Sequence, residues 1–100
     1  MKVGFFTSAE AYAEHNRRQA EAIRNNGLRI MKESLDKALD GEDAKERWLS
    51  ENMMYAEGID DSYREAEWEH HIEWMCGYIK SLERKIRKLE RDADKALANA

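Results

Sequence analysis

Apolar side chains recur every three or four residues through most of the chain, which is the period of an α-helix. The clearest run lies in the last third, where spacings of four and three alternate without error: Trp68, Ile72, Met75, Ile79, Leu82, Ile86, Leu89, Ala93 and Ala96. In a heptad assignment isoleucine falls at position a and leucine at position d, which is typical of parallel two-stranded coiled coils. The pattern predicts a helix over about 61–97 with a coiled-coil seam.

A second amphipathic stripe covers the first forty residues. Its apolar or small positions are Ala9, Tyr12, Asn16, Ala20, Ile23, Gly27, Ile30, Ser34 and Ala38, joined by a neighbouring row of Leu28, Met31, Leu35 and Leu39. Thr7 or Ser8 is expected to begin this helix, with Glu10 completing a capping box. Asn25-Asn26-Gly27 is a plausible stop signal, but the stripe keeps its phase through it. One helix over about 8–39 is favoured over two helices broken near 26–27.

Two polar turns separate a short middle helix from the long ones. Asp40-Gly41-Glu42-Asp43 ends the first helix, and residues 57–61 precede the last, which leaves a helix over about 43–56. The fold class expected is all-α, in one domain over 1–100, as a small helical bundle or a long helical hairpin.

The seam of the last helix has two possible uses, self-association or packing inside the monomer against the small-residue stripe of the first helix. A homodimer is favoured, through Trp68, Ile72, Met75, Ile79, Leu82, Ile86 and Leu89. Both uses can coexist, because Trp74 and Tyr78 form a second apolar edge on the same helix.

Composition narrows the class of protein. The chain has 100 residues, no proline and 38% charged residues, which favours helix over sheet. Its one cysteine, Cys76, excludes an internal disulfide and a cysteine-based zinc site. No signal peptide and no membrane-spanning run is recognisable, so we expect a cytoplasmic protein that does not act in a membrane.

The net charge of −4 hides strong segregation. Residues 1–39 hold seven basic and five acidic side chains, residues 40–73 hold three and twelve, and residues 74–100 hold seven and four. Such polarity indicates either packing between oppositely charged elements or a partner of one sign.

Catalytic motifs are absent from the sequence. There is no glycine-rich phosphate loop and no Ser/His/Asp or Cys/His pattern, so we expect no enzymatic activity and no cofactor. Glu67 and His70 have the Glu-x-x-His spacing of di-iron bundles, but such sites need two of these motifs and two more glutamates. We interpret this pair as a solvated surface and expect no metal site.

The acidic–aromatic segment, residues 46–74, is the best candidate for an interaction surface. Carboxylates at helical spacing imitate a row of phosphates, and aromatic side chains are the usual anchors of protein interfaces. The residues predicted to bind a partner are Glu46, Trp48, Glu51, Tyr55, Asp60, Asp61, Tyr63, Glu65, Glu67, Glu69 and Trp74. The expected partner is a protein with a basic surface.

The basic side chains of the last helix suggest a different partner. Lys80, Arg84, Lys85, Arg87, Lys88 and Arg91 form a stretch that would track phosphates. Glu83 and Glu90 lie among them and the whole chain is acidic. Direct nucleic-acid binding is therefore the less favoured interpretation.

In size, charge and lack of catalytic motifs, the chain resembles the small acidic helical proteins that phages and mobile elements encode against host machinery, such as anti-CRISPR and anti-restriction proteins. This is a resemblance of kind, and it transfers no functional residue. It implies an inhibitor of host nucleic-acid machinery that mimics DNA or blocks a basic groove. The alternatives are a coiled-coil adaptor or assembly factor, and a nucleic-acid-binding protein.

Overall fold

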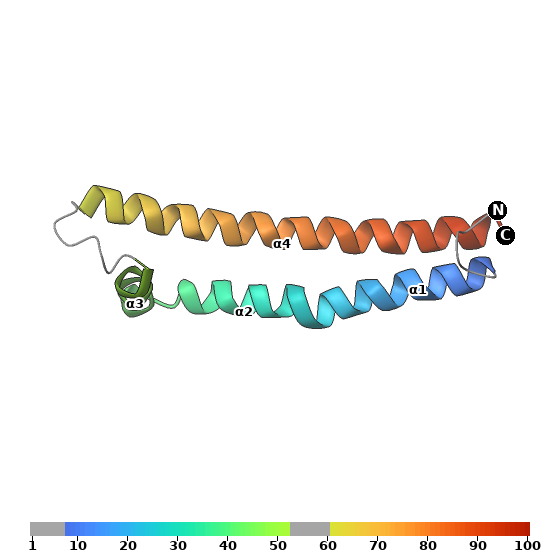
Figure 1. The fold of residues 1–100 in the computed structure, drawn as a ribbon, viewed down its shortest axis with the longest axis horizontal. Helices are drawn as coiled ribbons and strands as arrows, with labels where there is room; N and C mark the ends of the chain where they lie inside the picture. The colour runs from blue at the N-terminus through green and yellow to red at the C-terminus, as the bar shows by residue number, and fades with distance from the viewer. Residues whose placement is uncertain (1–7, 53–60) are drawn as a thin grey trace. The chain divides into compact units, whose positions relative to one another are not determined.

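The computed structural model describes residues 8–52 and 61–100, of which 93% are helical and none is in a strand. The elements are α1 (Ala9–Ala22), the π-helical segment η1 (Ile23–Leu28), α2 (Arg29–Ala38), α3 (Glu42–Asn52) and α4 (Asp61–Ala98) (Figure 1). The predicted all-α fold is confirmed. The described residues form two compact units, one built from residues up to Arg29 and from Lys80 onward, the other from Ile30–Ile79.

The first helix begins at a side-chain cap. Ser8 has an extended backbone, and its hydroxyl oxygen accepts a hydrogen bond from the amide of Ala11 at 3.1 Å. This satisfies one of the amides that the first turn of a helix leaves without an intrahelical partner. Ser8 is thus the capping residue of the two that the sequence offered, and Thr7 lies outside the described residues.

The helix does not break at Asn25-Asn26-Gly27 but widens there into η1. A π turn takes up one more residue than an α turn, so it shifts the phase of every side chain that follows. Ala20 and Leu28 are buried, whereas Ile30 is 52% exposed and Ser34 is also exposed. Of the second predicted row, Met31 and Leu35 are half-buried and Leu39 is 60% exposed, whereas Ala38 of the first row is half-buried. The inward side of α2 therefore takes residues from both predicted rows.

In the first unit, α1 and η1 lie antiparallel to the C-terminal part of α4 (Figure 1). Two ion pairs set the register, Arg17 with Asp94 at 3.0 Å and Arg24 with Glu90 at 2.8 Å. The core between these elements is made mainly of small side chains and includes Ala13, Ala20, Ile86, Ala93 and Ala96. Since alanine has no side chain beyond Cβ, the helices can approach closely.

In the second unit, α3 packs on α2 and on the first part of α4. Figure 1 shows α3 nearly end-on, so its axis runs steeply across the axes of the other two helices. Leu49 is 1% exposed and is the largest fully buried side chain among the described residues. Gly41, with a φ of 118°, makes the turn from α2 into α3, a backbone conformation that side chains with a Cβ rarely adopt.

The predicted seam of α4 is covered within the single chain. Met75, Ile79 and Ile86 are buried, and Trp68, Ile72, Leu82 and Leu89 are half-buried. The alternative of packing inside the monomer therefore accounts for these residues, and a two-stranded coiled coil through them would have to displace the chain's own helices. The homodimer itself stays a prediction.

Within residues 8–52 and 61–100, no helix combines the length and the apolar character that crossing a membrane requires.

Candidate protein-interaction surface

An aromatic cluster joins α3 to α4. The ring of Trp48 stacks on the imidazole of His71, with centroids 4.4 Å apart and planes 19° apart. Trp48 also meets Trp68 edge to face, at 5.6 Å and 61°. Such offset and T-shaped contacts suit the ring quadrupoles and add to the free energy of burying the rings. Trp48, predicted to contact a partner, therefore lies in the contact between these two helices.

Two ion pairs lie beside this cluster. Lys45 of α3 pairs with Glu65 of α4, and Arg64 of α4 pairs with Glu46 of α3 at 3.4 Å. The hydrogen bond from Lys45 to Glu65 raises the pKa of the lysine ammonium above its ordinary value. Glu46 and Glu65 were predicted to face a partner, but in this structure their charges are neutralised by α4 and α3 respectively.

The aromatic row continues outward along α4. His71 stacks with Trp74 at 6.5 Å and 13°, and Trp74 stacks with Tyr78 at 5.6 Å and 16°. Trp74 is 56% exposed and Tyr78 is 44% exposed. The row thus begins in the packed contact with α3 and ends in two stacked rings that are open to solvent.

These exposed rings belong to one face of the helix, which we call the Trp74 face. Its members up to Trp74 follow each other at spacings of three and four residues, and the last two lie three and four residues after Trp74. This places them on the same side of an α-helix: Tyr63, Glu67, His70, Trp74, Gly77 and Tyr78. Tyr63 is 49% exposed, and Glu67 is half-buried. Three large aromatic side chains therefore stand on a face that the described helices do not cover.

The carboxylates around the Trp74 face are largely unneutralised. Among the described residues, no ion pair reaches Asp61, Glu67, Glu69 or Glu73. Glu51 of α3 has none in this part of the chain either. The exposed end of the aromatic row consequently lies in a field of negative charge.

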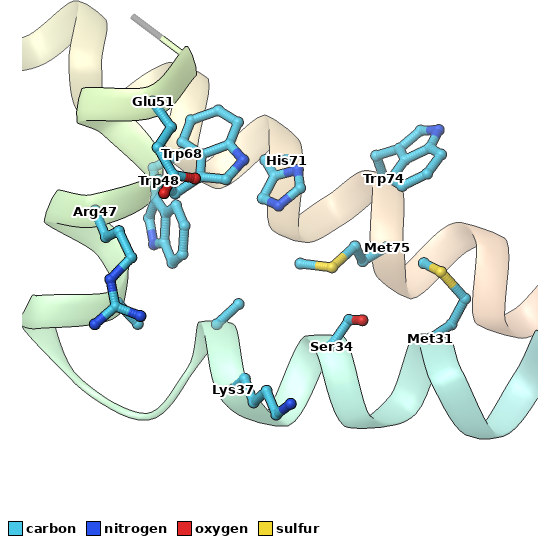
Figure 2. A pocket seen from close by; sticks show the side chains of 12 residues that line it. Met31, Ser34, Lys37, Arg47, Trp48, Glu51, Trp68, His71, Trp74 and Met75 are labelled. Carbon is cyan, nitrogen blue, oxygen red and sulfur yellow. The ribbon is translucent and has the colours of Figure 1, made fainter.

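A groove of about 380 Å³ lies between α2, α3 and α4 (Figure 2). Trp48 and Trp68 form one end, and Met31 and Met75 point into the space between α2 and α4. The other lining residues are Ser34, Lys37, Ala38, Ala44, Arg47, Glu51, His71 and Trp74. Trp74 therefore belongs both to the groove and to the exposed row, so the two are continuous.

His71 stands at the junction of packed and exposed rings. Burial lowers the pKa of its imidazole below the ordinary value for histidine, because the charged form loses hydration there. Burial thus favours the neutral imidazole, which stacks with Trp48 and with Trp74.

The structure sorts the predicted partner-binding residues into three groups. Glu46, Trp48 and Glu65 lie in the contact between α3 and α4, whereas Glu51, Asp61, Tyr63, Glu69 and Trp74 are exposed and Glu67 is half-buried. Tyr55 and Asp60 lie outside the described residues. His71 and Gly77 were not predicted as part of the surface, although the spacing of three between Trp74 and Gly77 would have indicated the latter.

Residues 8–52 and 61–100 contain no group of three His, Cys, Asp or Glu side chains placed to hold a metal ion. The free thiol of Cys76 is half-buried.

The chain matches no protein-family model, and comparisons with curated proteins and with solved structures find no significant match. A function is therefore argued from the geometry of this surface.

Proposed function

We propose that this chain is a non-enzymatic protein-interaction module that binds a protein partner with a basic surface. The observation that carries the proposal is the exposed Trp74–Tyr78 stack among carboxylates that have no ion pair in the described structure. Exposed tryptophan and tyrosine are the side chains most often responsible for binding energy at protein interfaces. The surrounding negative charge favours a basic partner and steers its approach.

The activity that fits such a partner best is inhibition of host nucleic-acid machinery. A protein that handles DNA or RNA has a basic groove for phosphates, and Glu69 and Glu73, one helical turn apart on α4, would present carboxylates to it in place of phosphates. The small acidic proteins of phages and mobile elements, which this chain resembles in kind, act in this manner. Occupying the groove would block the nucleic acid without any chemical step.

A double charge reversal, Glu67→Lys with Glu69→Lys, tests the proposal. Both carboxylates lie on α4 without ion pairs in the described structure, so the fold should survive the change. Glu65 is left intact, because reversing it would also break its contact with Lys45. The partner is first captured from a lysate of the natural host with the unmodified protein and identified by mass spectrometry, and its affinity for each variant is then measured.

A matched control carries the same change in net charge elsewhere. Glu21→Lys with Asp36→Lys alters two exposed carboxylates of α1 and α2. We expect the reversal on α4 to weaken binding by more than tenfold and the control to leave it within about twofold, since only the first pair lies in the acidic–aromatic segment. Equal affinities of the two variants would refute the proposal.

The mass of the free protein in solution tests the predicted homodimer. The seam residues Met75, Ile79 and Ile86 are buried within the chain, so a dimer of the folded chain would have to use another surface. A monomeric mass would also remove the coiled-coil adaptor as a function.

A further inference from the structure

Gly77 occupies an unusual place in α4. It lies inside a 38-residue helix and is exposed to solvent, and a Cβ built on it would meet no atom within 4 Å. Glycine in a helix interior lowers the helix-forming equilibrium constant about fivefold relative to alanine. Gly27, by contrast, lies against Leu82, whose Cδ1 would be 3.7 Å from an added Cβ. The packing of the described residues thus gives no reason for glycine at position 77.

The neighbours of Gly77 supply a reason. Trp74 precedes it by three residues and Tyr78 follows it directly, and these two stacked rings are both exposed. Because the two rings stack on each other and Gly77 lies beside them on the helix, its missing Cβ leaves a notch next to the stack in which another backbone can approach the helix axis. The distance between packed helices depends on the side chains at their point of contact, and small residues there allow the shortest distances.

The ring faces and the charges specify what fits on either side of the notch. The π-faces of tryptophan and tyrosine attract cations, and arginine more often than lysine, because the planar guanidinium stacks on the ring and is weakly hydrated. Glu67 lies two helical turns before Trp74 and Glu73 directly precedes it, and neither has an ion pair within the described residues. Their charges favour the same cation and repel a phosphate backbone.

We propose that the Trp74 face receives an arginine-bearing helix of the partner protein, which crosses α4 at Gly77. One guanidinium lies on the face of Tyr78 that is turned away from Trp74, since Trp74 already stacks with His71 and Tyr78, and others pair with Glu67 and Glu73. The inference rests on the proposed function and adds the recognised chemistry and the crossing point to it.

The test uses the full chain and a synthetic helical peptide as the probe. The peptide has an alanine-based sequence with arginines three and four residues apart, and a second peptide carries lysine at the same places. We expect the arginine peptide to bind several-fold more tightly than the lysine peptide, because the planar guanidinium stacks on the ring and is more weakly hydrated than an ammonium group. The indole N–H resonance of Trp74, assigned by its loss in Trp74→Phe, should shift during the titration.

Substitutions at the notch separate binding from folding. Gly77→Ala should raise the melting temperature, because alanine favours the helix, and should still weaken binding of the arginine peptide several-fold, because the methyl fills the notch. Gly77→Leu should weaken it more than tenfold. Ile30→Ala, which truncates an apolar side chain that is 52% exposed on α2, is the control and should leave the affinity unchanged.

Four results would overturn the inference. The first is that Gly77→Leu binds the arginine peptide as tightly as the unmodified protein does. The second is that the unmodified protein binds the arginine and lysine peptides with equal affinity. The third is a dimeric mass of the free protein that becomes monomeric in Gly77→Leu, which would identify a second copy as the occupant. The fourth is competition by single-stranded DNA for the same face.

The proposed function fails on different grounds. If reversal of Glu67 and Glu69 abolishes binding of the captured partner while Gly77→Leu does not, the interaction module stands and the crossing at Gly77 is wrong. If the charge reversal has no effect, the proposed function is itself wrong.

Discussion

Gly27→Ala should stabilise the protein, and the structure lets the size of the effect be worked out. Gly27 lies in η1, half-buried, where the helix passes Leu82. The added Cβ would lie 3.7 Å from the Cδ1 atom of Leu82, which is an ordinary van der Waals contact, so the methyl fits without displacing its neighbour. It also removes conformational freedom from the unfolded chain, which raises the free energy of unfolding.

The expected gain is about 1 kcal/mol, the difference between glycine and alanine in a helix. For a domain of this size it corresponds to a rise in melting temperature of about 4–8 °C. Urea denaturation followed by far-ultraviolet circular dichroism measures it as a higher midpoint at an unchanged slope.

Two matched variants should lower the free energy of unfolding instead of raising it. Gly27→Leu exceeds the space beside Leu82 and should destabilise by about 1–3 kcal/mol through overpacking. Gly41→Ala should destabilise by about 1–2 kcal/mol, because the φ of 118° at Gly41 disfavours any residue with a Cβ. If Gly27→Ala lowers the midpoint as Gly27→Leu does, the helices approach each other more closely at this point than the structure shows and the reasoning is wrong.

Three further predictions follow from single side chains. Leu49→Ala should lower the free energy of unfolding by about 2–5 kcal/mol in urea denaturation, because it leaves a cavity where a side chain only 1% exposed packs α3. Ser8→Ala should cost about 1 kcal/mol in the same assay, since the amide of Ala11 loses its acceptor. Because the pKa of His71 is lowered in the folded protein, the unfolded chain binds a proton at this residue first as the pH falls. The free energy of unfolding should therefore decrease as the pH drops below about 6.5. In thermal melts between about pH 7 and 5, His71→Phe should show a smaller decrease in melting temperature than the unmodified protein. Identical pH profiles of the two proteins would contradict this assignment.

The helices were predictable because their signals are local. Spacings of three and four residues identify an amphipathic helix, and Gly41 among acidic residues marks a turn whatever the rest of the chain does. The π segment was not predictable in this way. Asn25, Asn26 and Gly27 are weak helix formers that are compatible with a break, a wide turn or a regular helix. Which of these forms depends on the helix packed against them.

The use of the heptad seam was ambiguous for a similar reason. Ile79 and Ile86 satisfy the same pattern whether they pack against a helix of the same chain or of a second chain. The heptad pattern favoured a homodimer, whereas Ala13 and Ala20 of the small-residue stripe are buried within the single chain, as is Ile86 of the seam.

Only part of the candidate site followed from the sequence, because ion pairing depends on how α3 packs on α4. Glu65 and Glu69 are both glutamates and lie one helical turn apart. Glu65 nevertheless pairs with Lys45, whereas Glu69 has no ion pair among the described residues. Trp48 and Trp74 differ in the same way. Trp48 stacks on His71 inside the contact, whereas Trp74 is 56% exposed. A list of acidic and aromatic residues cannot make these distinctions.

The exposed face of α4 is more informative than its seam. Met75 is buried, and an apolar side chain at a buried position is explained by packing alone, so its identity says little about function. Trp74, its neighbour in the sequence, is not needed in that way, because a polar residue at a position 56% exposed would satisfy the helix equally well and would increase solubility. The same holds for Gly77, where alanine would favour the helix. Trp74 and Gly77, which lie about one helical turn apart among unneutralised carboxylates, each oppose the stability or solubility of the free chain, and this is why we propose that a partner covers them.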